Sequence, residues 1–124
     1  MHRSRDNSAT VVWNLPELLS RVDNDQELLA DLLTIFKEEF PRNLQALEAA
    51  VAGADLQKTA ALSHTLKGML SNLACTRAAA AVSRLESLAS AGNGKSLLDA
   101  LEQFKQETAR LVPEIEAYMA GVHG

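Results

Sequence analysis

Aromatic residues and cysteine are scarce in this chain of 124 residues. Aromatics make up 4%, and Cys75 is the single cysteine. A lone cysteine forms no internal disulfide, which favours a reducing compartment, and we expect a cytoplasmic protein. Strand-forming residues do not cluster anywhere, whereas leucine and alanine are abundant. The composition therefore predicts an all-α domain.

Long apolar runs, basic clusters and phosphate loops are also missing. No run reaches the roughly 18 apolar residues of a membrane-spanning helix, and the charged start lacks the apolar core of a signal sequence. With a net charge of −4 and no basic stripe, we expect neither nucleic acid nor a membrane as a direct partner. Without a glycine-rich phosphate loop, we expect no bound nucleotide or other cofactor.

The chain divides into a short polar segment and one domain. Residues 1–12 predict a flexible tail or linker, and residues 13–121 predict the folded domain. Asn14 and Glu17 have the spacing of a capping box, which predicts a short helix after Asn14. Trp13 is expected to pack that helix against the rest of the domain.

Four longer helices are predicted from apolar periodicity and from their caps. Asn24 is the predicted cap of the second helix, Asp55 that of the third and Thr76 that of the fourth. The predicted ranges are 25–52, 56–74, 77–91 and 96–120. Pro41 is expected to kink the first of these helices or loosen one of its turns, and Pro113 lies inside the last. Four long helices with short connections predict a monomeric, antiparallel up-down four-helix bundle, with the short helix lying across one end.

The third predicted helix carries an unusual group of residues on its outer side. At 100° per residue, its core stripe is Leu62, Leu66, Met69 and Leu73, with Leu70 at the edge. His64 falls on the opposite side. The residues near it are mostly small, and one is cationic: Ala60, Ala61, Lys67, Gly68 and Ser71.

These residue types suit the transfer of a phosphoryl group to His64. A neutral imidazole is a nucleophile, and Lys67, one turn further on, can pair with an anion bound to the ring. Gly68 costs the helix about 1 kcal/mol relative to alanine, but it leaves room for another protein. From spacing alone, the alternative is a surface histidine beside a solvated lysine, with Gly68 serving close helix packing.

A family resemblance favours the first interpretation. The run from His64 to Gly68, HTLKG, with Ala61 before it and Asn72 after it, resembles the signature of histidine-containing phosphotransfer (HPt) domains. Residues 32–55 resemble the preceding helix of that family, and Leu85-Glu86 resembles the segment that follows. The resemblance covers about residues 15–115.

The resemblance implies a four-helix bundle in which one histidine carries phosphoryl groups between aspartates of receiver domains. His64 matches the phosphoryl acceptor, Lys67 the lysine that stabilises the phosphoryl group, and Gly68 the small residue that admits the receiver. By position, Glu86 matches the polar residue that contacts the second ring nitrogen. Ala60, Ala61 and Ser71 are then expected to face the partner.

The sequence departs from the family at two positions. Met69 stands where a small residue is common, and we expect it to fill space in the core. Ala74 stands where glycine is usual, and we expect it to let the helix run slightly longer.

The resemblance also implies the partners, which are receiver domains of response regulators. The receiver would bring Mg²⁺ and the aspartate, and the domain itself would have no kinase activity. A terminal domain of a hybrid sensor kinase and a free-standing carrier fit the sequence equally. The rival function is an interaction module that binds a partner without carrying phosphate. A purely structural bundle is a third reading, but it leaves the residues around His64 unexplained.

Other chemistry has less support in the sequence. His2, His64 and His123 are too scattered for a metal site. Ser63 and Ser71 lack a carboxylate that would orient a base for nucleophilic catalysis. Cys75, at a helix boundary, is expected to be a small buried residue rather than a reactive thiol.

Overall fold

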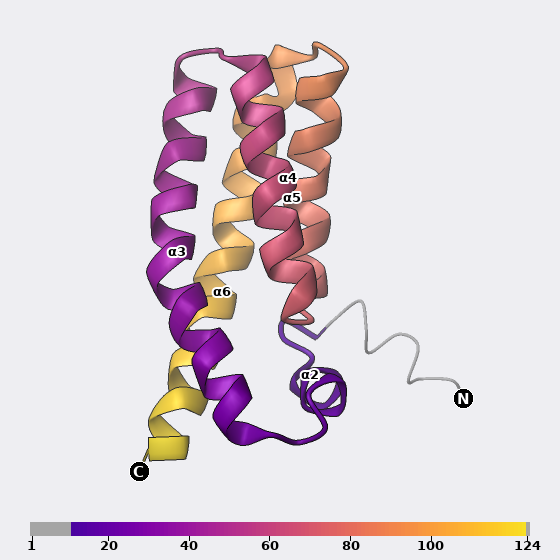
Figure 1. Ribbon diagram of the computed structural model, residues 1–124. Coiled ribbons are helices and arrows are strands. Elements are labelled where there is room, and N and C mark those ends of the chain that lie inside the picture. Colours follow the sequence, from indigo (N-terminus) through magenta and orange to yellow (C-terminus); the bar gives the residue numbers. More distant parts are fainter. Residues whose placement is uncertain (1–10, 124) are drawn as a thin grey trace, which may run out of the picture.

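The computed structural model describes residues 11–123, with side chains as far as Gly121. Its helical elements are α2 (Leu15–Arg21), α3 (Gln26–Ala52), α4 (Leu56–Asn72), α5 (Thr76–Ser90), the short 3₁₀ helix η1 (Gly94–Ser96) and α6 (Leu97–His123). Figure 1 shows α3 to α6 as an up-down bundle, with α2 across the end near the α4–α5 turn. The predicted all-α architecture is confirmed. Most of the predicted tail, with His2, lies outside the described residues, as does the side chain of His123.

Two of the predicted helix caps are confirmed. The side chain of Asn14 accepts a hydrogen bond from the backbone N–H of Glu17 at 3.2 Å. The side chain of Asp55 accepts one from the N–H of Lys58 at 3.0 Å. Each bond satisfies a backbone donor that the first turn of a helix leaves without an intrahelical partner.

The other two predicted caps are wrong by one residue. Asp25, not Asn24, caps α3, and its side chain accepts from the N–H of Leu28 at 3.0 Å. Asn24 instead takes a left-handed conformation, with φ of 58°. Thr76 is already the first residue of α5, and Cys75 holds the cap position without a side-chain hydrogen bond.

The prediction that Ala74 extends α4 is also wrong. The helix ends at Asn72, and Ala74 adopts a left-handed conformation with φ of 60°. The N–H of Ala74 bonds to the carbonyl of Ser71, and the N–H of Cys75 bonds to that of Leu70. This pair of bonds is a Schellman motif, in which glycine usually occupies the left-handed position. Ala74 therefore adopts the left-handed conformation that glycine usually adopts in this motif.

The buried side of α4 is rotated from the predicted stripe. Leu66 and Leu70 are fully buried, but so are Thr59 and Ser63, whereas Leu62 and Met69 are only partly buried. The rotation follows from the packing of α4, which contacts α5 more extensively than α3. The largest buried side chains elsewhere are Leu18, Leu29, Leu33, Leu47, Leu85, Phe104, Leu111 and Ile115.

The segment that contains α2 holds the C-terminal end of α4. The indole N–H of Trp13 donates to the carbonyl of Leu73 at 2.9 Å, and Trp13 is buried, as predicted. Arg21 Nη1 donates to the carbonyls of Ser71 at 2.8 Å and Asn72 at 3.4 Å. A cation at this position also interacts favourably with the helix dipole.

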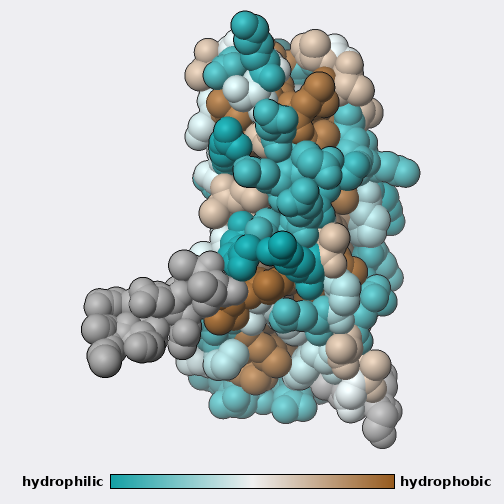
Figure 2. Space-filling model, turned by 180° about the vertical axis from the view of Figure 1, so that it is seen from behind, coloured by the Kyte–Doolittle hydropathy of each residue, from teal (hydrophilic) through white to brown (hydrophobic). Residues whose placement is uncertain are grey.

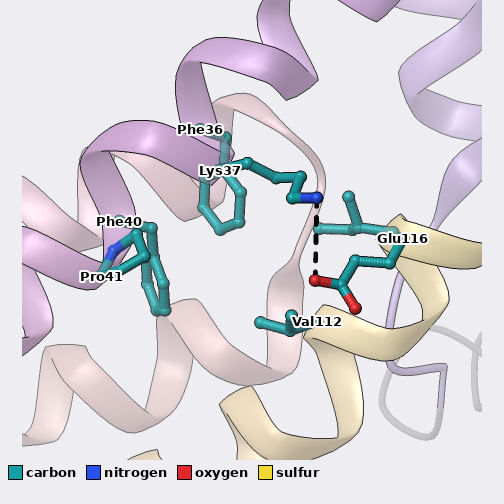
Figure 3. A pocket seen from close by; sticks show the side chains of 7 residues that line it. Phe36, Lys37, Phe40, Pro41, Val112 and Glu116 are labelled. Atoms are coloured by element: carbon teal, nitrogen blue, oxygen red, sulfur yellow. Dashed lines mark ion pairs between the residues drawn. The ribbon is translucent and has the colours of Figure 1, made fainter. Parts of the chain in front are cut away.

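The seam between α3 and α6 contains a small cleft at Pro41. Figure 3 shows Lys37 of α3 reaching toward Glu116 of α6, with 3.8 Å between Nζ and Oε2. The cleft has a volume of about 70 Å³, well below the roughly 300 Å³ at which small-molecule sites begin. The helix α3 continues through Pro41, and its first turns incline toward α2 in Figure 1. Among the described helices, none combines the length and apolarity needed to cross a membrane.

The left-handed turn after α3 gives a test of backbone strain. Ala54 is exposed and has φ of 55°, so Ala54→Gly should raise the free energy of unfolding by about 1 kcal/mol. The matched control is Ala49→Gly in the exposed interior of α3, which should lower it by about 1 kcal/mol. Urea titrations of the three proteins measure both changes. Equal effects of the same sign would contradict the assigned turn.

Candidate functional site

The close packing of α4 against α5 brings the proposed site residues together. The side of α5 that meets the core is rich in alanine, with Ala78, Ala79 and Ala89 buried. Such short side chains let two helices approach closely. His64 on α4 and Glu86 on α5 therefore lie within hydrogen-bonding distance, although 22 residues separate them in sequence.

His64 presents one ring nitrogen to Glu86. Its Nδ1 lies 3.0 Å from Glu86 Oε2. An ionised carboxylate only accepts hydrogen bonds, so in the neutral ring this contact favours the tautomer with the proton on Nδ1 and the lone pair on Nε2. The His64 side chain is 70% exposed, so a donor molecule can approach the ring from solvent. The predicted contact between Glu86 and the second ring nitrogen is present.

Lys67 pairs with the other oxygen of the same carboxylate. Its Nζ lies 3.4 Å from Glu86 Oε1, and its side chain is 38% exposed. Glu86 thus stands between the imidazole and the ammonium group and contacts both. A long lysine side chain can reorient at little cost near the surface, so its charge remains available to an anion at His64.

Most of the residues beside His64 on the surface of α4 have short side chains or none. A Cβ placed on Gly68 would meet no atom within 4 Å, so packing inside this chain does not require glycine there. Of the residues expected to face a partner, Ala61 and Ser71 are exposed, whereas Ala60 is only partly exposed and packs against the core. A side chain at position 68 would therefore extend into open space, which glycine leaves unoccupied.

The other nucleophile candidates do not form a second site. Ser63 is fully buried, and its hydroxyl has no hydrogen-bond partner among the described residues. Cys75 is also buried, and desolvation, with a smaller contribution from Glu114, raises the pKa of its thiol to about 12. It is therefore an inert thiol at neutral pH, as expected. The described residues include no cluster of side chains suited to a metal ion.

An apolar groove between α3 and α4 was not predicted from the sequence. Leu32, Ile35 and Phe36 line it from α3, and Met69 lines it from α4. The spacing of Leu28, Leu32 and Ile35 was the available signal, but the same spacing is typical of a buried helix face. Ile35 is in fact 55% exposed and Leu28 43%.

Comparisons with known proteins agree with this geometry. A sequence model described as the Hpt domain matches residues 31–118. The chain is also similar to the crystal structure of histidine-containing phosphotransfer protein B from Pseudomonas aeruginosa PAO1, with 23% identity and a TM-score of 0.82. That match covers 89% of this chain and 96% of the other, and it supports the fold. A search among curated proteins gave no match.

The unpaired hydroxyl beneath the site predicts a stabilising substitution. Ser63→Ala should raise the free energy of unfolding by about 1–2 kcal/mol, because it removes a buried polar group without a partner and improves helix propensity. Ser71→Ala, an exposed change in the same helix, should give only the propensity gain of about 0.5 kcal/mol. Thermal and urea unfolding measure the difference. A destabilised Ser63→Ala protein would mean that the hydroxyl has a partner.

Proposed function

Because this chain belongs to the Hpt domain family, we propose that it is a histidine phosphocarrier of a His–Asp phosphorelay. His64 accepts a phosphoryl group from the aspartyl phosphate of one receiver domain and passes it to the aspartate of another. The observation that carries this proposal is the His64 ring, whose Nδ1 lies 3.0 Å from Glu86 Oε2 while 70% of the side chain is exposed. The chain acts as a carrier, and its partners supply the kinase activity.

The transfer step forms one bond and breaks one. The lone pair of Nε2 attacks the phosphorus of the aspartyl phosphate, and an N–P bond forms. The bond between phosphorus and the aspartyl oxygen breaks, and its electron pair leaves on the aspartate carboxylate. The ring then carries a proton on Nδ1 and the phosphoryl group on Nε2, so it gains positive charge. The reverse step uses the same atoms with a second receiver.

The two charged neighbours of His64 act on different parts of this step. The Glu86 carboxylate lies 3.0 Å from Nδ1, where it fixes the reactive tautomer and offsets the charge that the ring gains. Lys67 is close enough to turn from Glu86 toward the phosphoryl oxygens, where it offsets negative charge. The receiver contributes the aspartate and its Mg²⁺, so no metal is needed on this chain.

The phosphoryl acceptor can be tested with two donors. The protein is incubated with phosphoramidate, or with a phosphorylated receiver domain, and its intact mass is measured. We expect one added phosphoryl group that is labile to acid and absent from His64→Gln, because glutamine has no nucleophilic ring nitrogen. A folded wild-type protein that takes no label from either donor would favour an interaction module.

The role of Glu86 predicts graded losses of transfer rate. Glu86→Ala removes both the hydrogen bond and the charge, so we expect transfer from a receiver to slow about tenfold or more. Glu86→Gln keeps an acceptor for Nδ1 and should slow transfer less. Glu116→Ala removes a glutamate far from His64 and is the control.

The tautomer of the His64 ring is a second measurement, which distinguishes a role of Glu86 in positioning the ring from a general effect on the structure. Nitrogen-15 NMR of the His64 ring at alkaline pH should show the proton on Nδ1 in the wild type and in Glu86→Gln. In Glu86→Ala the two tautomers should exchange. Unchanged transfer rates in both Glu86 variants would contradict the assigned role.

A further inference from the structure

A polar cleft lies between α5 and α6, apart from the site at His64. Its volume is about 380 Å³. The short side chains of Ala80 and Ala81 leave the hollow open, and longer polar side chains surround it: Arg77 of α5 and Gln103, Gln106, Glu107 and Arg110 of α6. Small-molecule sites of this size are lined mainly by apolar side chains. The lining of this cleft instead suits a charged partner.

The cleft and His64 lie on opposite sides of α5. Glu86 turns toward α4, where it contacts His64, and Arg77 turns toward α6, where it contacts Glu107. Arg77 precedes Glu86 by nine residues, or about two and a half turns at 100° per residue, which agrees with opposite faces. Because α6 lies behind α4 in Figure 1, Figure 2 shows the α6 side of the bundle, which is largely hydrophilic with separate smaller hydrophobic patches. A molecule in the cleft therefore leaves the His64 ring uncovered.

Positive charge gathers around this cleft in a chain that is acidic overall. Arg77 and Arg110 line it, and Arg84 borders it, because its Nη1 donates to Gln103 Oε1 at 2.9 Å. Glu107 is the one acid in the described lining. Three guanidinium groups and one carboxylate leave an excess of two positive charges here, whereas the whole chain has a net charge of −4. The local field therefore attracts an anionic group.

Two groups in the cleft have unused binding capacity. Arg110 makes no hydrogen bond or ion pair among the described residues, although Glu114 follows it by one helical turn. Glu107 Oε2 accepts from Arg77 Nη2 at 2.8 Å, but its Oε1 is buried and has no hydrogen-bond partner in the described chain. The cleft thus offers a cation for an anionic group and an acceptor for an N–H donor.

We infer that this cleft docks an acidic segment of a partner protein, with carboxylates paired to Arg110 and Arg84 and a backbone N–H of the segment donating to Glu107 Oε1. Guanidinium groups match carboxylates in a fork geometry, and such pairs are stronger than neutral hydrogen bonds. This inference does not rest on the proposed phosphocarrier function. A partner held in the cleft leaves the His64 ring exposed, so the two surfaces do not compete.

The dimensions of the cleft fit a short extended segment. Arg77 and Arg84 are seven residues apart, which places them about 10 Å apart along α5. Carboxylates two residues apart in an extended segment lie on one side of it and are spaced by about 7 Å, so two or three of them span the cleft. A nucleic-acid strand would continue beyond the cleft over the acidic remainder of the surface, which repels its phosphates.

The docking surface is tested by NMR titration of the nitrogen-15-labelled protein with two six-residue peptides, (Glu-Gly)₃ and (Gln-Gly)₃, which differ only in charge. We expect the acidic peptide to shift the backbone amides of residues 77–84 and 103–110 and to leave those of residues 61–68 in place. Its binding should weaken about threefold or more between about 20 and about 200 mM salt, because counterions screen the ion pairs. Equal shifts from both peptides, no binding of (Glu-Gly)₃, or shifts centred outside the cleft would overturn the inference.

Arg110→Gln tests the role of charge, because Arg110 has no partner in the described chain whose loss would disturb the fold. It should raise the Kd for (Glu-Gly)₃ about threefold, and Arg110→Glu should raise it about tenfold. Arg42→Gln is the matched control, because Arg42 is exposed on α3, which does not line the cleft, and the variant loses the same charge. Equal Kd values for Arg110→Gln and Arg42→Gln would contradict docking in the cleft.

Two further titrations distinguish a protein segment from other anions. Inorganic phosphate and a short single-stranded DNA are added in place of the peptide, and both should bind to the cleft more weakly than (Glu-Gly)₃. Equal or tighter binding of phosphate would make the cleft a small-anion site, and tighter binding of DNA would make it a nucleic-acid surface; either result overturns the inference. None of these titrations requires phosphorylation of His64, so their outcome is independent of the proposed function.

Discussion

The packing of α4 against α5 is the constraint on which the candidate site at His64 depends. His64 and Glu86 come from different helices, and their contact of 3.0 Å exists only while the two helices keep their relative height and rotation. The alanine-rich face of α5 allows this close approach. The same packing turns Ser63 inward and leaves the His64 ring outside. One interface therefore sets both the contact of the ring with Glu86 and its exposure to solvent.

The C-terminal end of α4 is held by residues that lie before residues 31–118, the part of the chain that the Hpt domain model matches. Trp13 and Arg21 donate to the last carbonyls of α4, and the N–H of Asn14 bonds to the carbonyl of Ala74. These bonds replace the intrahelical partners that the end of a helix lacks. They also stabilise the left-handed Ala74, which local preference alone disfavours. The helix that carries His64 is thus held along its side by α5 and at its end by the α2 segment.

Local signals in the sequence were sufficient to predict the fold class, the helix caps at Asn14 and Asp55, and the side of α4 that faces solvent. The contact between His64 and Glu86 was predicted only through the family resemblance, since no local pattern relates residues 22 positions apart. The burial of Ser63 was missed because the rotation of α4 is set by α5, a tertiary effect. The turn at Ala74 was missed because alanine there occupies a left-handed position at which glycine is the usual signal. The groove at Ile35 was missed because an apolar stripe does not reveal whether it is covered.

Gly68 bears on the stability of the isolated chain. Within the isolated chain nothing occupies the space that a side chain at position 68 would fill, and a glycine in mid-helix weakens the bundle. Packing within the chain therefore offers no reason for glycine at this position, and under the proposed function the missing methyl group would matter in the complex rather than in the monomer. Selection for thermal stability alone would tend to replace this residue, so the bundle at rest is less stable than its architecture allows. Under the proposed function, the free protein would be less stable at this position so that a partner could approach.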